Sequence, residues 1–218
     1  MSIFNDYIER VGMSKRTHTD AKIVSSIEYF ERNFHTSPSY YQVDIDGELV
    51  DTIINKTSHH NIKKIHFRRN YEPKIGSIIT FQNKKYLLLE IDRDEIYTFG
   101  KMEECNNVFS VHTGEIENVQ VGVNGRGVPV FKEVYKYDEI PCIVRDRYYS
   151  VNENSPLPLP DGKLQIELRY IKAPNIEINE TFEMYGREYK ISDISYVNVK
   201  NGVGTITIYA EKRDDANE

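Results

Sequence analysis

The sequence predicts a mainly β protein with two tandem small β-barrel or sandwich units, SH3-like or OB-like, and an N-terminal helical segment. Three observations predict this fold class. The apolar residues are mostly Ile, Val, Tyr and Phe, and 16 Tyr with 9 Phe among 218 residues favour strands over helices. Beyond residue 38, apolar and polar positions mostly alternate. A strand-rich block of the first half also recurs in the second half.

The N-terminal segment, residues 1–37, has the spacing of a helix. Apolar side chains recur every three or four positions, at Ile23, Ile27, Phe30 and Phe34. Three residues can serve as the N-cap: Thr17, Thr19 and Asp20. Pro38 should end the helix, because the residue before a proline disfavours helical backbone. A shorter helix is also expected over residues 2–12.

The first β unit is expected over residues 38–118. Apolar and polar residues alternate in the segments YYQVDI, ELVDTII, IKKIHFRR, GSIITF, KYLLLEI and EIYTFGKMEE. Asp46-Gly47 separates the first two segments, and glycine accepts the positive φ that a tight hairpin turn requires. Asn83-Lys84 marks another short turn. The pattern therefore predicts short antiparallel strands.

The second β unit is expected over residues 119–215. Between residues 105 and 145 the chain is strand-like, and Gly114 and Asn124-Gly125 are expected to be turns.

A Pro-rich loop, residues 152–162, should be extended and lie at the surface. The strands after it alternate cleanly, and two dipeptides mark hairpin turns between them: Tyr185-Gly186 and Asn201-Gly202. The last residues, RDDANE, have the composition of a solvated tail.

An internal repeat supports two similar units. PKIGSIITF begins at Pro73, and PNIEINETF begins at Pro174. At an offset of 101 residues, four pairs are identical: Pro73/Pro174, Ile75/Ile176, Thr80/Thr181 and Phe81/Phe182. An aromatic-led strand resumes at Tyr86 and Tyr189, which leaves two extra residues in the second turn. Two copies are too few to stack as a solenoid, so the repeat indicates two small barrels.

The charge of the chain argues against tight nucleic-acid binding. The formal net charge is -6, with 15 Lys and Arg against 18 Asp and Glu over residues 1–118, and 13 against 16 over residues 119–218. Neither part has the basic stripe of a duplex-binding protein. No apolar run reaches the roughly 18 residues that a membrane span needs. The N-terminus also lacks the apolar region of a signal peptide.

The two cysteines, Cys105 and Cys142, have no further Cys or His at metal-ligand spacing. They could pair, but reduced thiols in a protein assembled in the cytoplasm are the favoured interpretation.

No catalytic or cofactor-binding motif emerges. Asp44, Asp46 and Asp51 superficially resemble a calcium loop, but its twelfth position is Asn55 and strands flank it, so a hairpin turn is favoured. The run GVNGRG lacks the Gly-Lys-Ser/Thr ending of a P-loop, and the sequence has no G-x-S-x-G. We therefore expect no enzymatic activity, no metal and no cofactor.

Basic side chains and histidines concentrate in one short region that includes Lys56, His59, His60, Lys63 and Lys64. Adjacent histidines in a strand or turn point apart, and no carboxylate or thiol is spaced to complete a metal site. An exposed loop tip and a solvated strand face are favoured over a metal site or a phosphate-facing role.

The run from Gly76 to Asn107, which begins GSIITFQNKKYLLLEID and closes with IYTFGKMEECNN, resembles proteins from the structural modules of tailed phages of Gram-positive bacteria. The similar proteins are head-tail connector components, namely head-closure (stopper) and tail-completion proteins. The resemblance covers about residues 40–107 and, through the repeat, about 163–212. The chain departs from the usual stopper in its greater length and its N-terminal helix.

The resemblance implies a structural virion protein that forms an oligomeric ring at the head-tail junction, or neck. Its implied partners are further copies of itself, the portal or adaptor protein, tail proteins, and DNA that passes through the channel without sequence-specific binding. No membrane is implied, and the expected location is the virion, assembled in the host bacterial cytoplasm. Loop residues are the candidates for subunit or channel contacts: Lys56, His59, His60, Lys63, Lys64, Asn124 and Arg126.

Other functions stay open at this point. A tail, baseplate or adhesion component would suit tandem barrels equally well. A non-viral OB-like module could bind single-stranded nucleic acid by stacking bases on Tyr and Phe.

Overall fold

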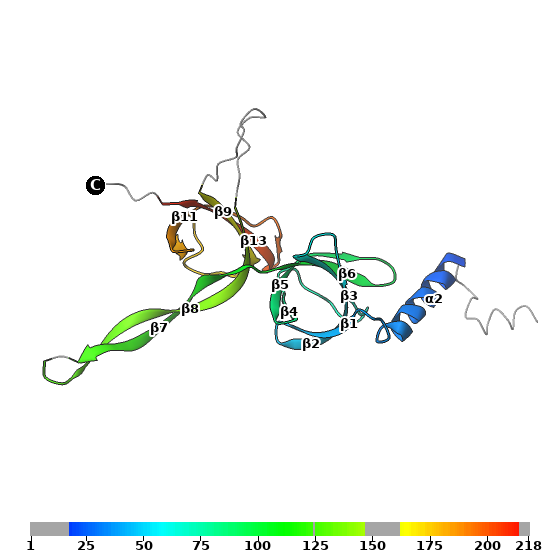
Figure 1. The fold of residues 1–218 in the computed structure, drawn as a ribbon, viewed down its shortest axis with the longest axis horizontal. Coiled ribbons are helices and arrows are strands. Elements are labelled where there is room, and N and C mark those ends of the chain that lie inside the picture. The colour runs from blue at the N-terminus through cyan, green and yellow to red at the C-terminus, as the bar shows by residue number, and fades with distance from the viewer. Residues whose placement is uncertain (1–17, 124, 147–161, 214–218) are drawn as a thin grey trace, which may run out of the picture.

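The computed structural model describes residues 18–123, 125–146 and 162–213 (Figure 1). The helix expected over residues 2–12, nearly all of the Pro-rich loop and the end of the C-terminal tail lie outside these ranges. The predicted fold class is confirmed: the chain is mainly β, with two barrel-like sheets in tandem and one short N-terminal helix.

Helix α2 (His18–Asn33) lies against the first barrel, at the end of the molecule away from the second sheet (Figure 1). Phe34, just after the helix, is fully buried, and the Phe30 ring stacks on Tyr97 with 5.0 Å between ring centroids. The Glu31 carboxylate pairs with the Arg68 guanidinium at 2.9 Å. Phe30 and Phe34 of the predicted apolar stripe therefore pack on the barrel.

The first sheet is a closed barrel in the order β1-β2-β3-β6-β5-β4. Its strands are β1 (Tyr40–Ile45), β2 (Glu48–Lys56), β3 (Ile62–Phe67), β4 (Ile78–Phe81), β5 (Lys84–Arg93) and β6 (Thr98–Glu104). Strand β1 closes the barrel by pairing with β4, where Asp44 lies opposite Thr80 and Ile45 opposite Ile79. Inward-facing aliphatic and aromatic side chains fill the interior, among them Ile65, Phe67, Ile79 and Leu88.

The second sheet follows the same path, in the order β7-β8-β9-β13-β11-β10. Its strands are β7 (Asn107–Val123), β8 (Pro129–Asp146), β9 (Lys163–Arg169), β10 (Thr181–Met184), β11 (Arg187–Ser195) and β13 (Val203–Lys212), and the short β12 (Val199–Lys200) pairs with β13. Its core is separate from that of the first barrel and includes Phe109, Ile166, Leu168, Ile191 and Ile208.

The change from one sheet to the other falls between Glu104 and Asn107. The sequence pattern places it at residue 118, because the alternation in β7 does not reveal its partner. β7 pairs with β8 from Asn107 onward, so the whole strand belongs to the second sheet.

In four of the hairpins, a two-residue turn joins the two strands. Asp46-Gly47, Tyr185-Gly186 and Asn201-Gly202 form turns as predicted, and both residues of each turn have positive φ. In the β4–β5 hairpin the turn residues are Gln82 and Asn83, one position earlier than predicted. Positive φ at both positions is the signature of the type I′ turn, which suits the twist of paired strands.

The repeat is present in the fold, but at an offset of 103 residues instead of 101. Turn Gln82-Asn83 corresponds to turn Tyr185-Gly186, and the register shift after Leu88 in β5 corresponds to the one after Ile191 in β11. With this offset Tyr86 matches Tyr189 and no residues are inserted. The four identities at offset 101 therefore do not occupy equivalent positions, because turn and bulge geometry, and not the shared Pro and Thr, fixes the register.

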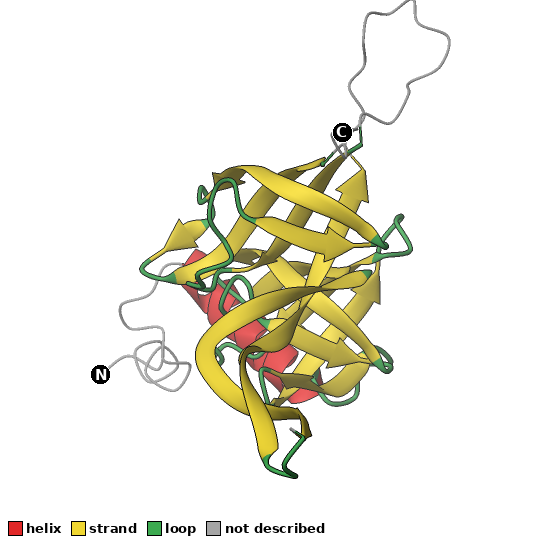
Figure 2. Cartoon of the chain, turned by 90° about the vertical axis from the view of Figure 1, so that its left-hand side faces the viewer, coloured by secondary structure: helices red, strands yellow, loops and turns green. Residues whose placement is uncertain are grey.

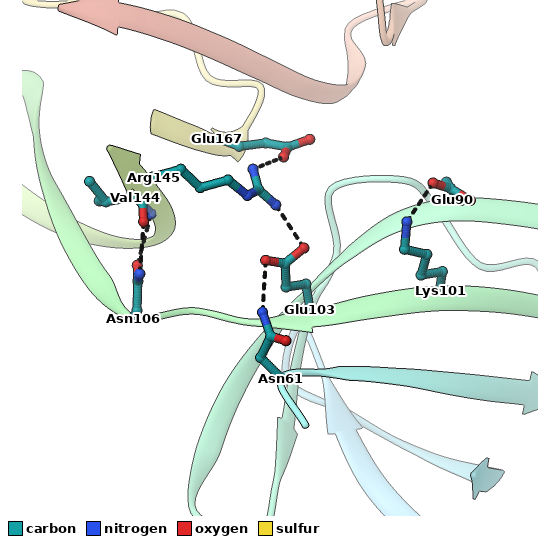
Figure 3. Close-up of polar contacts among 8 residues, drawn as sticks. All are labelled: Asn61, Glu90, Lys101, Glu103, Asn106, Val144, Arg145 and Glu167. Carbon is teal, nitrogen blue, oxygen red and sulfur yellow. Dashed lines mark hydrogen bonds and ion pairs between the residues drawn. The ribbon is translucent and has the colours of Figure 1, made fainter. Parts of the chain in front are cut away.

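Polar contacts fasten the two sheets together (Figure 3). The Arg145 guanidinium on β8 donates to Glu103 on β6 at 2.7 Å and to Glu167 on β9 at 2.9 Å. The Asn106 side chain exchanges two 2.8 Å hydrogen bonds with the backbone of Val144.

Backbone also meets backbone at this junction, where Gly76 lies against Gly204. A Cβ added to Gly76 would collide with the Gly204 carbonyl oxygen. Only glycine allows so close an approach at a position whose φ is +87°.

Candidate functional site

A long two-stranded arm projects from the second sheet, clear of both barrels (Figure 1), and it comes toward the viewer in Figure 2. We define the arm as residues 113–139, the outer parts of β7 and β8 with their connection, of which residue 124 is not described. Every described residue of the arm is exposed. Eleven strand residues from 113 to 123 span about 35 Å at the rise of an antiparallel strand. The arm is an elongated counterpart of the β1–β2 hairpin, which closes after Ile45.

The arm is unusually apolar for an exposed element. Among the described residues, 19 large hydrophobic side chains are exposed, and ten of these are on the arm: Ile116, Val119, Val121, Val123, Val128, Val130, Phe131, Val134, Tyr135 and Tyr137. An isolated two-stranded hairpin is marginally stable in water, and exposed apolar clusters of this kind mark interaction surfaces. The arm is therefore the first candidate for a functional surface.

Two irregularities shape the arm. The register of β7 against β8 shifts between His112 and Ile116 and again between Gln120 and Gly122. The first shift contains Gly114, whose φ is +81°. The sequence analysis placed a turn at Gly114, and this is wrong: the glycine forms a bulge within β7, because paired strand continues on both sides of it.

The second candidate is the seam between β7 and β10, where the second sheet does not close. In the first barrel the corresponding strands, β1 and β4, are paired. Along the described parts of β7 and β10 no such pairing occurs. Instead the Asn175 side chain bonds to the β7 backbone, accepting from the His112 N–H and donating to the Ser110 carbonyl, each at 2.8 Å.

A groove of about 1000 Å³ follows this seam onto the base of the arm. Apolar side chains line it from both strands, with Phe109 and Phe182 in ring contact at 5.0 Å. Tyr135 and Tyr137 extend the lining onto the arm, where their rings contact His112. Two carboxylates also line the groove: Glu180 and Glu183. The groove thus combines an apolar lining with negative charge.

The site residues predicted from the sequence separate into two places. His59, Lys63 and Lys64 line a hollow of about 440 Å³ on the outside of the first barrel. Lys56 lies opposite Lys63 in the β2–β3 pair, and His60 is exposed in the turn between these strands. Arg126 lies near the tip of the arm, and Asn124 falls outside the described residues.

The hollow on the first barrel has mixed charge. The Lys64 ammonium lies 3.9 Å from the centre of the Phe99 ring, and Lys101 pairs with Glu90 at 3.0 Å. Three lysines and two carboxylates, Glu90 and Asp92, line the same hollow. A phosphate-binding face needs a clear excess of cations, and the excess of lysines over carboxylates here is one.

Neither cysteine has the surroundings of a reactive thiol. Cys105 and Cys142 are both free, and burial raises the pKa of each thiol to about 12. A thiol with so high a pKa stays protonated at neutral pH and is a poor nucleophile. Within the described ranges, no three His, Cys, Asp or Glu side chains gather as a metal site would require.

The profile of a family described as "YomX C-terminal domain" matches residues 77–211, which is more than half of the chain. The chain belongs to the YomX C-terminal domain family. The match runs from β4 of the first barrel through β13, so it includes the arm, the seam and the junction between the sheets.

A relative within this similarity is the SPbeta prophage-derived uncharacterized protein YomX of Bacillus subtilis (strain 168). It is 26% identical over 148 residues, which make up 63% of this chain and 65% of the relative. The chain thus matches slightly less than two thirds of the relative's length. Together with the YomX C-terminal domain profile, this similarity indicates a phage-derived protein.

Among solved structures, MrkH of K. pneumonia aligns over 88% of this chain and 85% of its own, with 9% identity and a TM-score of 0.22. A TM-score so low carries no argument about fold or function. Within the described residues, no helix is both long and apolar enough to cross a membrane.

Two features were not predicted from the sequence: the arm and the open seam. The arm has a signal in the sequence, namely two long alternating runs on either side of Asn124-Gly125. The open seam has none, because a strand's own pattern does not say whether its outer edge is paired.

Proposed function

We propose that this protein is a structural component of a tailed-phage particle, and that it assembles into a ring at the head-tail junction. The observation that carries the proposal is the arm: ten exposed apolar side chains on a hairpin that stands clear of the barrels. Such a hairpin needs a partner surface to bury these side chains. The similarity to a prophage-derived protein supports a role in a phage, and a phage particle is a setting in which copies of one subunit meet.

The rest of the molecule suits a subunit that holds its shape. Ion pairs and close backbone contact join the two barrels, so an arm on one barrel has a defined direction relative to the other. An arm on one surface that binds a different surface of the next copy makes a heterologous contact, and such contacts close into rings when the rotation allows. No enzymatic step is part of the proposal.

Purified particles of the phage that encodes the chain provide the test. We expect mass spectrometry to find the protein in the particle and gold-labelled antibody to mark the neck. We also expect a phage that lacks the gene to accumulate DNA-filled heads and free tails that do not join. Label on the tail tip or baseplate would show that the protein occupies another position in the particle. Its absence from particles would contradict a structural role.

A further inference from the structure

We propose that the arm tip of one copy adds as a strand to the free edge of β10 in the next copy and so closes its open barrel. This inference rests on the proposed assembly role and names the two surfaces that meet. The outer edge of β10 borders the seam. In a two-residue hairpin, the residues that flank the turn hydrogen-bond to each other, and the pattern alternates from there along the strand.

The β10 edge is therefore available for pairing. Met184 and Phe182 direct their backbone groups to β11, whereas Thr181 and Glu183 direct theirs into the seam. Within the described ranges the backbone groups of Thr181 and Glu183 have no hydrogen-bond partner. An unpaired edge of this kind is a template for an added strand.

The first barrel shows what fills this position when the sheet closes. At the offset of 103, Ile78 and Thr80 are the counterparts of Thr181 and Glu183. The Ile78 carbonyl accepts from the Asp46 N–H at 3.1 Å, and Thr80 lies opposite Asp44 of β1. In the first barrel a strand of this chain, β1, thus pairs along the equivalent edge, whereas its counterpart β7 does not pair with β10 in the described part of the second sheet.

The chemistry of the seam favours the arm tip, which we define as residues 119–123 and 125–132. This segment contains two basic residues, Arg126 and Lys132, and no Asp or Glu. Along β10, Phe182 and Met184 face inward while Thr181 and Glu183 are exposed. An added β8 tip with Phe131 facing inward would meet Phe182, and Lys132 would then face outward beside Glu183.

The tip must come from another copy. The arm leaves the second barrel at the seam and extends away from it, so its own tip lies far from β10 (Figure 1). In the arm, β8 pairs only with β7, and β9 pairs with β8 from Cys142 to Asp146 alone. Its outer edge is thus open toward a neighbour among the described strands. A contact between the arm tip of one copy and the seam of the next is heterologous. Each copy can therefore bind one neighbour through its tip and another through its seam.

Two variants with matched controls test the contact. Glu183→Pro removes one of the two β10 N–H groups that point into the seam, and proline is tolerated on an edge strand whose N–H faces outward. Glu183→Gln keeps that N–H as its control. Phe131→Asp places a charge on the arm tip, and Phe131→Leu keeps the tip apolar. We expect the wild type and both controls to self-associate in light scattering, and each blocked variant alone to run at the chain mass of 25.5 kDa.

Mixing the two blocked variants gives the decisive result. Glu183→Pro keeps an intact tip and Phe131→Asp keeps an intact seam, so the mixture should form a species of twice the chain mass and nothing larger. This recovery also shows that both variants are folded. A mixture that stays monomeric, a Glu183→Pro chain that associates like the wild type, or a wild type that is monomeric at every concentration would overturn the inference. Particle labelling tests the neck separately, so association in vitro without the protein in particles would refute only the proposed function.

Discussion

The two barrels share one strand order but differ at one place. In the first barrel, β1 turns back after Asp46-Gly47 and pairs with β4, so the sheet has no free edge there. In the second sheet, the corresponding hairpin continues into the arm, and the edge of β10 stays unpaired. Closed barrels abolish edges, whereas an open edge beside apolar surface invites association. The two features available for association, an unpaired edge and an exposed apolar hairpin, therefore both belong to the second sheet.

The exposed apolar side chains are also distributed unequally between the first barrel and the second sheet. Leu49 and Tyr41 are the exposed large hydrophobic residues on the described strands of the first barrel, against ten on the arm alone. A soluble protein rarely exposes so many apolar side chains on one element unless they bind something. Substitutions at matched positions of the two units can test this difference.

The largest effect is expected at the close backbone contact between the barrels. Gly76→Ala should lower the free energy of unfolding by about 4 kcal/mol, because the new Cβ collides with the Gly204 carbonyl and strains a residue with positive φ. Chemical denaturation monitored by circular dichroism would measure it.

Asn179 provides the matched control in the second unit. It lies 103 residues after Gly76 and has a φ of +78°. Asn179→Ala therefore adds backbone strain without the collision and should cost about 1 kcal/mol. Equal costs at the two positions would show that the contact between Gly76 and Gly204 does not constrain the barrels.

The next largest loss of stability is expected at the closed seam of the first barrel, and a smaller one at the open seam of the second. Ile79 is fully buried in the first barrel, and its counterpart Phe182 is only partly buried at the groove. Ile79→Ala should cost about 3 kcal/mol, as in a packed core, and Phe182→Ala about half as much despite its larger side chain. Urea titrations of monomeric protein would compare them. A greater loss at Phe182 would mean that the second seam is already packed shut.

A smaller effect is expected from the ion pairs that join the barrels. Arg145→Ala leaves the side chains of Glu103 and Glu167, only 8% and 13% exposed, without their shared cation. We expect a loss of about 2 kcal/mol, since unpaired buried carboxylates are costly. Lys101→Ala removes the exposed pair with Glu90, drawn beside it in Figure 3, and should cost less than about 0.5 kcal/mol. Thermal unfolding of both variants would decide whether burial makes this difference.

The smallest effect is a pH dependence in the first barrel. Burial, helped by the nearby Lys64, lowers the pKa of His66 below its ordinary value of 6.5. The unfolded chain therefore takes up the proton more readily, so stability should fall as the pH drops through 6.5 and level off below the folded pKa. His66→Gln should flatten this part of the stability profile, and an unchanged profile would assign the acid sensitivity to other groups.

The sequence predicts the local structure well where a residue's own conformation decides it. Asp46-Gly47 and Tyr185-Gly186 form turns because their backbones accept positive φ, and the helix ends at Asn33, ahead of the Ser37-Pro38 pair that would exclude its continuation. These features depend on neighbours in the chain, so a pattern of a few residues is sufficient to predict them.

Features that depend on distant partners escape sequence reasoning. Glu103 reads as a surface residue of an alternating strand, yet it is buried because Arg145 and Asn61 meet it there. The basic loop has an excess of positive charge in the sequence, but Glu90 and Asp92 from β5 offset part of it in the fold. The free edge of β10 is defined by the strand that does not join it.

Hydrogen-deuterium exchange along β10, with β4 as the internal reference, tests the central claim most directly. At low concentration the amide of Glu183 should exchange fast and that of its counterpart Thr80 slowly, because only the latter lies at a closed seam. As the concentration rises and copies associate, Glu183 should become protected while Thr80 stays unchanged. Protection of Glu183 in the monomer, or fast exchange that persists in the assembled protein, would contradict the claim that a neighbour's arm closes the open barrel.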